Sequence, residues 1–83
     1  MFEKIFPKEH KMSPEELGRV IRAERRKQRL RQAELAALAG VGTRFVSDLE
    51  SGKPSVELGR AFHILSMLGL TLEPRHRDWR DLE

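Results

Sequence analysis

Two groups of side chains in this 83-residue protein have types and spacing suited to binding a polyanion. The first is a run between residues 19 and 31 with seven cations and one acid, Glu24, which leaves a local charge of +6. The cations are Arg19, Arg22, Arg25, Arg26, Lys27, Arg29 and Arg31. Such a field attracts nucleic acid, whose phosphates supply much of the binding affinity. The run is equally typical of a solvated helix face, so charge alone leaves both interpretations open.

The second group is polar and lies between residues 43 and 48, on a segment with helical spacing. Its members are Thr43, Arg44, Ser47 and Asp48. Val46 and Leu49 are spaced to fix the opposite side to a core, so the polar set stays free to enter a major groove. The fork of an arginine matches the two acceptors of guanine. We expect Arg44 to contact guanine or, alternatively, phosphate.

Five residue types at fixed spacing indicate a helix-turn-helix. They are Gln32, Ala36, Gly40, Val46 and Leu49, at the first, fifth, ninth, fifteenth and eighteenth places. Two helices that cross steeply need a small side chain at their closest approach, which Ala36 provides. The turn needs a positive φ, which Gly40 adopts at little cost. A helical hairpin with no role at DNA is the alternative.

Four helices are expected to position these groups, in an all-α fold of four or five helices. The first spans residues 13–28, with Ser13 as cap, Pro14 in the first turn and two glutamates at the positive end of the dipole. The next two span residues 32–39 and 43–51. The last begins near residue 55 and stops at Gly69. Its apolar stripe consists of Leu58, Ala61, Phe62, Leu65 and Leu68.

A short strand is expected after the last helix, because Leu70-Thr71-Leu72-Glu73 alternates apolar and polar residues. A lone strand needs a partner, and the same strand of a second copy would supply one. A docked extended tail is the alternative. The expected division of the chain is an arm over 1–12 that is flexible or forms a short strand, a DNA-binding domain over 13–69, a dimerisation strand over 70–74 and a polar tail over 75–83.

Several functional classes are disfavoured by composition. The chain has no cysteine, and His10, His63 and His76 are scattered, so we expect no metal site. With no glycine-rich phosphate loop either, we expect no cofactor and no enzymatic activity. No apolar run approaches the roughly 20 residues of a membrane span. The first twelve residues lack the apolar block of a signal peptide. We therefore expect a cytoplasmic protein without a membrane partner.

The motif resembles the Xre family, which comprises phage-repressor-like helix-turn-helix proteins. The resemblance covers about residues 15–69 and rests on Gln32-Ala33-Glu34-Leu35-Ala36, Gly40-Val41 and the run from Val46 to Lys53. A narrower resemblance is to HipB-like antitoxins, including those of the Y4mF type. It rests on the segment from Arg44 through Pro54 and on Met67-Leu68-Gly69-Leu70 before the strand. The resemblance implies a homodimer whose strands pair between subunits on a double-stranded DNA operator.

The resemblance also implies residue roles. Thr43, Arg44, Ser47 and Asp48 would meet base edges, and Gln32, Arg31, Ser51 and Lys53 would hold phosphate. Arg25 would pair with Glu50, which offsets the unfavourable position of an acid near a helix C-terminus.

Two positions depart from the family pattern. Phe45 is large and either touches a thymine methyl or packs inward. Asp48 is acidic where many relatives are neutral, and it either accepts from a cytosine amine or repels phosphate and narrows the range of tolerated sites.

An antitoxin of this kind implies a HipA-type kinase toxin as partner and repression of its own operon by the complex. Trp79 is then a candidate toxin contact, with packing across the dimer strands as the alternative. A second interpretation is a stand-alone phage-type or operon repressor without a toxin.

Overall fold

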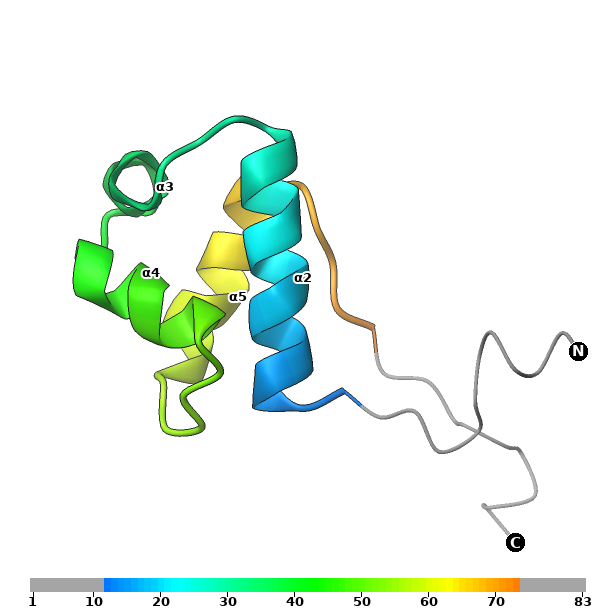
Figure 1. Ribbon diagram of the computed structural model, residues 1–83. Helices are drawn as coiled ribbons and strands as arrows, with labels where there is room; N and C mark the ends of the chain where they lie inside the picture. The colour runs from blue at the N-terminus through cyan, green and yellow to red at the C-terminus, as the bar shows by residue number, and fades with distance from the viewer. Residues whose placement is uncertain (1–11, 74–83) are drawn as a thin grey trace, which may run out of the picture.

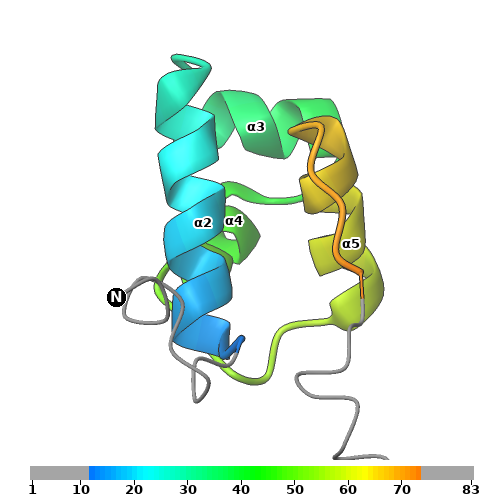
Figure 2. The same cartoon turned by 90° about the vertical axis from the view of Figure 1, so that its right-hand side faces the viewer.

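The computed structural model describes residues 12–73, which form four helices and no strand within that range. They are α2 (Pro14–Lys27), α3 (Gln32–Ala39), α4 (Thr43–Glu50) and α5 (Leu58–Met67). In Figure 1, α3 and α4 lie to one side of α2. Figure 2 shows α2 and α5 on two sides of the domain with α3 crossing between their upper ends. The predicted all-α class with four helices is confirmed.

The helix boundaries follow local chemistry. Ser13 caps α2, because its Oγ accepts from the backbone N–H of Glu16 at 3.0 Å. The predicted bounds of α3 are exact, and Gly40 ends that helix in the left-handed conformation with φ 71°. The third helix stops one residue earlier than predicted, with Ser51 as its C-cap. None of the helices within residues 12–73 is long and apolar enough to cross a membrane.

All four helices contribute to a single core. Its buried apolar residues are Ile21, Leu35, Ala36, Ala39, Val46, Leu49, Ala61, Ile64, Leu65 and Leu68. The predicted stripe on α5 is wrong in two members, since Leu58 is 61% exposed and Phe62 47% exposed, whereas Ile64 is fully buried. The helix also begins at Leu58 rather than near residue 55, with the Glu57 carboxylate accepting from the Arg60 N–H at 2.8 Å.

The segment after α5 is extended, and within residues 12–73 it pairs with no strand. Leu70 is half-buried against the core and donates its N–H to the Leu65 carbonyl at 2.8 Å, while residues 71–73 are exposed. Figure 2 shows this segment running back along α5. The predicted strand is therefore not formed within residues 12–73, and its pairing with a second copy stays a prediction. The other residues of the predicted arm and strand, and the whole tail with Trp79, lie outside the described residues.

A glycine that the sequence analysis did not single out sets the approach of α2 to α4. Gly18 is buried, and a Cβ there would lie 2.5 Å from the Glu50 carbonyl oxygen and 2.7 Å from that of Leu49. Both atoms belong to the backbone of α4 and cannot rotate away. Hydrogen at this position therefore allows the last turn of α4 to rest directly on α2.

Gly18→Ala should lower the free energy of unfolding by about 1–3 kcal/mol, because the helices must move apart to admit the methyl group. Gly59→Ala is the matched control, since its Cβ would meet only the flexible Glu57 carboxylate at 3.2 Å. That change should be neutral or stabilise by up to about 1 kcal/mol. Urea unfolding of both variants measures this, and equal stability of Gly18→Ala and the wild type would contradict the assignment.

Candidate nucleic-acid interface

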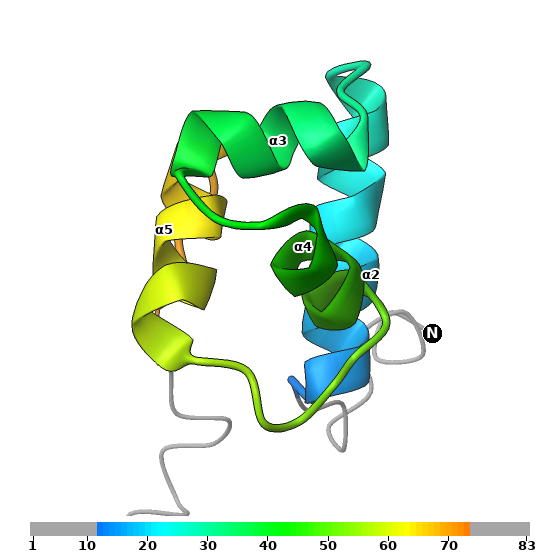
Figure 3. The same ribbon diagram turned by 90° about the vertical axis from the view of Figure 1, so that its left-hand side faces the viewer.

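The turn between α3 and α4 fixes how the second helix is presented. After Gly40, the Val41 N–H donates to the Ala36 carbonyl at 3.0 Å, and Gly42 then caps α4. Ala36 is buried at the contact of the two helices, as its small size predicts. Figure 3 shows α3 crossing above α4 on the same side of the domain. The two helices have the arrangement that places a second helix in a major groove.

The outer side of α4 carries the polar set predicted from the sequence. Thr43, Arg44 and Ser47 are exposed, and the Arg44 side chain retains 91% of its accessible surface. Val46 and Leu49 are buried on the inner side, and Phe45 packs half-buried against the core. Of the two alternatives for Phe45, the structure therefore favours inward packing.

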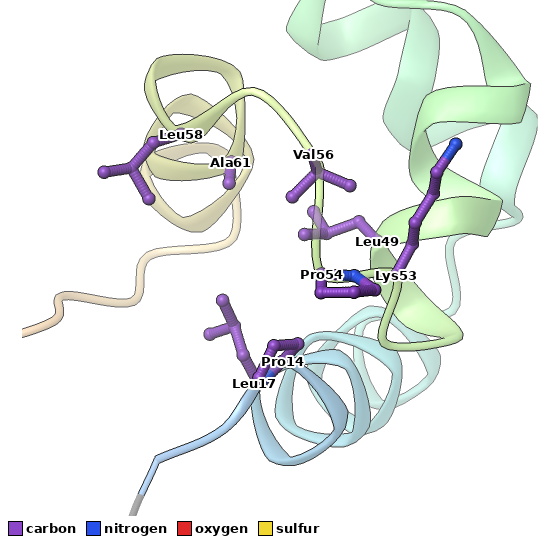
Figure 4. Close-up of a pocket in the computed structure, with 8 residues that line it drawn as sticks. All are labelled: Pro14, Leu17, Leu49, Lys53, Pro54, Val56, Leu58 and Ala61. Carbon is purple, nitrogen blue, oxygen red and sulfur yellow. The ribbon is translucent and has the colours of Figure 1, made fainter.

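Asp48 differs from its neighbours because its carboxylate lies between two cations. Its Oδ2 is 4.0 Å from Arg44 Nε and 3.6 Å from Lys53 Nζ. Lys53 lines an apolar pocket with its aliphatic stem, while its ammonium points away from that pocket (Figure 4). The spacing of Arg44 and Asp48 is the i,i+4 signal for a helical ion pair. The sequence analysis missed that pair and its continuation to Lys53.

The four residues assigned to phosphate lie at helix ends but do not all have free polar groups. Arg31 precedes α3 and pairs with Glu34 at 3.6 Å. The Ser51 hydroxyl donates to the Asp48 carbonyl at 3.0 Å, and the Gln32 amide donates to Glu50 Oε1 at 3.0 Å. An amide nitrogen has two hydrogens, so Gln32 keeps one donor for phosphate. The Gln32–Glu50 bond was not predicted.

Arg25 and Glu50, the pair implied by the resemblance, are in direct contact. Arg25 Nε lies 2.5 Å from Glu50 Oε2 and Nη2 lies 3.0 Å from Oε1, while Nη1 donates to the Leu30 carbonyl at 2.7 Å. Both residues are only 7% exposed. Two parallel bonds from one guanidinium give a fixed geometry as well as binding energy. Together with Gln32, this network joins α2, α3 and α4.

The same contacts control the pKa of Glu50. Burial alone would raise this pKa, but the hydrogen bonds from Arg25 and Gln32 outweigh it and hold the pKa below the ordinary value of 4.5. The bond from Glu50 also raises the pKa of the Arg25 guanidinium. At the interface, the N–H of Arg31 lowers the pKa of Glu34. The central pair is therefore fully charged at neutral pH.

Comparison with known proteins agrees with this geometry. Residues 21–74 match the family described as Helix-turn-helix. The chain is 44% identical over 61 residues to the uncharacterized HTH-type transcriptional regulator y4mF of Sinorhizobium fredii (strain NBRC 101917 / NGR234), a match that covers 74% of this chain and 80% of the relative. A solved structure of a HipB–O4 20mer complex is similar at a TM-score of 0.73 and 25% identity. A structure described as MDT protein is similar at 0.74 and 25% identity. Each structural match covers 82% of this chain and 96% of the other.

The chain belongs to the helix-turn-helix family and has the Xre-like form of that fold. Within the family it is a homologue of the Y4mF-type transcriptional regulators, with the fold of HipB. It is accordingly a DNA-binding transcriptional regulator, as the name of its relative also states.

Acid should destabilise the protein through Glu50. The folded-state pKa is lower than that of the unfolded chain, so the stability due to this group is complete above about pH 4.5 and is lost as pH falls through the folded pKa. Glu50→Gln should cost about 3 kcal/mol at pH 7, because Arg25 loses its buried partner. The free energy of unfolding of this variant should also depend less on pH, because the carboxyl group that titrates is absent.

Urea unfolding between pH 7 and 3 measures both effects. Glu34→Gln is the control, since Glu34 also has a lowered pKa but lies at the surface, and it should retain most of the acid sensitivity. If Glu50→Gln keeps the full wild-type pH dependence, the acid-sensitive group lies elsewhere.

Proposed function

We propose that this protein is a sequence-specific transcriptional repressor that binds a two-fold operator as a homodimer. The observation that carries the proposal is the exposed polar side of α4, held in one orientation by the buried contact of Arg25 with Glu50. Rigid presentation is needed for reading bases, because donors and acceptors in the groove must be met within hydrogen-bonding distance. Such a regulator works in the compartment that holds its DNA, which fits the cytoplasmic location expected from the sequence.

The roles of individual residues follow from their places. Thr43, Arg44, Ser47 and Asp48 face outward from α4 and are assigned to base edges. Arg31, Gln32, Ser51 and Lys53 flank the two helices at their ends and are assigned to phosphate, where contacts position a protein without reading sequence.

Dimerisation is assigned to residues 70–73, with Pro74 at the end of the predicted strand. Leu70 is packed on the core, and residues 71–73 are exposed with no strand beside them in the described part of the chain. Leu72 is 43% exposed, and the apolar side chains of Leu58 and Phe62 are also exposed on α5. These exposed apolar side chains are available for burial against a second copy.

Arg44→Ala should reduce the preference for the selected DNA sequence over random DNA by about 1–3 kcal/mol, while general DNA binding is retained.

Lys53→Ala should weaken binding equally on all sequences, and the slope of log K against log[salt] should decrease in magnitude by about 1. Fluorescence anisotropy on a site selected from a random library and on a random duplex measures both. The selected site should be two-fold symmetric, with half-sites about 34–36 Å apart.

Three outcomes would contradict these assignments. An equal loss of affinity on both duplexes for Arg44→Ala would assign Arg44 to a phosphate contact instead of a base contact. An unchanged slope of log K against log[salt] for Lys53→Ala would remove Lys53 from the proposed DNA interface. A selected site without symmetry would contradict the homodimer.

The regulator is further proposed to be the antitoxin of a HipBA-like system that binds a HipA-type kinase toxin and represses its own operon. The structural likeness to the protein in the HipB–O4 complex supports this, as does the narrower sequence resemblance. Trp79, outside the described residues, remains the proposed toxin contact. A stand-alone phage-type or operon repressor is the competing function.

Purification of the tagged chain from its native cell should recover a kinase-like protein in stoichiometric amount together with DNA from its own operon. Trp79→Ala should reduce that recovery without changing DNA binding, because large aromatics anchor protein interfaces. Recovery of DNA alone would favour the stand-alone repressor.

A further inference from the structure

Each cation assigned to the DNA interface has an acid within 4.0 Å. Arg31 pairs with Glu34 at 3.6 Å, and Arg44 and Lys53 share Asp48. Three cations at and just beyond the end of α2 differ, since within residues 12–73 the side chains of Arg26, Lys27 and Arg29 make no ion pair. The surface assigned to DNA bases is thus close to charge balance.

Asp48 is held in a fixed place on this surface. Its carbonyl accepts from the Lys53 N–H at 3.0 Å and from the Ser51 hydroxyl at 3.0 Å, so the end of α4 and the turn after it are tied to this residue. Its carboxylate joins Arg44 on the helix to Lys53 beyond the turn, and 29% of the side chain is exposed. The carboxylate therefore competes directly with DNA for two of the proposed contacts.

We propose that Asp48 is a selectivity residue that restrains Arg44 and Lys53 from binding phosphates of arbitrary sequence. The inference rests on the proposed function and specifies how its site discriminates. On random DNA, both cations must leave the carboxylate, which then faces phosphate with its charge unpaired. At a matching site, the cytosine amino group in the major groove donates to the carboxylate and replaces the lost partners.

The size of the effect follows from the exposure of these pairs. Exposed ion pairs contribute modestly, and loss of two of them together with repulsion of phosphate corresponds to about a 3–10-fold change in affinity. Asp48→Asn keeps the shape and removes the charge. It should bind random DNA about 3–10-fold more tightly and gain less, or lose affinity, on the selected site.

The test measures anisotropy of a labelled random duplex of about 24 base pairs and of the site that the wild type selects. Asp48→Glu restores the charge and should return affinity for random DNA toward the wild-type value. Glu57→Gln is the matched control, because Glu57 also pairs with an arginine, Arg60, but lies at the start of α5. It should change both affinities by less than about twofold, as expected for a screened surface charge.

A mutant cycle that combines Asp48→Asn with Arg44→Ala and Lys53→Ala separates restraint of the two cations from repulsion between the carboxylate and phosphate. In that double variant, Asp48→Asn should gain less on random DNA than it does in the wild type, because the cations it would release are absent and only the repulsion of phosphate by the carboxylate is removed. A full gain in this background would overturn the proposal, as would an equal gain from Glu57→Gln.

The proposed function and the inference fail in different ways. Wild-type protein that binds neither duplex and selects no site would end both. Wild-type protein that selects a site while Asp48→Asn leaves the ratio of the two affinities unchanged would end the inference alone.

Discussion

The buried contact of Arg25 with Glu50 is the interaction on which the presentation of α4 depends. It connects the last turn of α2 to the last residue of α4, and Gln32 extends it to α3. A buried ion pair adds little net stability compared with an apolar pair of similar volume. The pair instead fixes the relative orientation of the helices, because two parallel hydrogen bonds tolerate little rotation of one helix against the other.

Close approach of the backbones makes this contact possible. Gly18 lies two turns before Arg25 on α2, and the last carbonyls of α4 rest on it. The core then supplies most of the cohesion, with Ile21, Leu35, Val46 and Ile64 fully buried. Apolar packing is not directional, whereas the polar contacts above it are. The orientation of α4 thus results from a glycine, a core and an ion pair acting at one helix crossing.

The parts of the fold that depend on local chemistry were predictable from the sequence. The caps at Ser13 and Gly40 and the bounds of α3 follow from residues within a few positions of one another. The buried side of α5 was not predictable in this way, because the helix has two overlapping apolar stripes. Only docking against the other helices selects the stripe that contains Ile64.

Contacts across the chain were also hidden from sequence reasoning. Gly18 has the appearance of a weak point in a helix until its neighbour, the end of α4, is known. The bond of Gln32 to Glu50 and the pairing of Asp48 with Lys53 bridge separate elements, so spacing within one helix cannot reveal them. The pairing of Arg25 with Glu50 was expected only through the family resemblance.

The C-terminal ends of α2 and α5 are joined by a hydrogen bond, which limits how the helix-turn-helix can move relative to α5. The Gln28 amide donates to the Leu68 carbonyl at 2.8 Å, and Leu70 is packed on the core just beyond. The start of the segment that follows α5 is therefore fixed to the core. If two copies join through that segment, its fixed start on the core links the position of α4 in one copy to that in the other, so the spacing of the operator half-sites is selected by geometry as well as by chemistry.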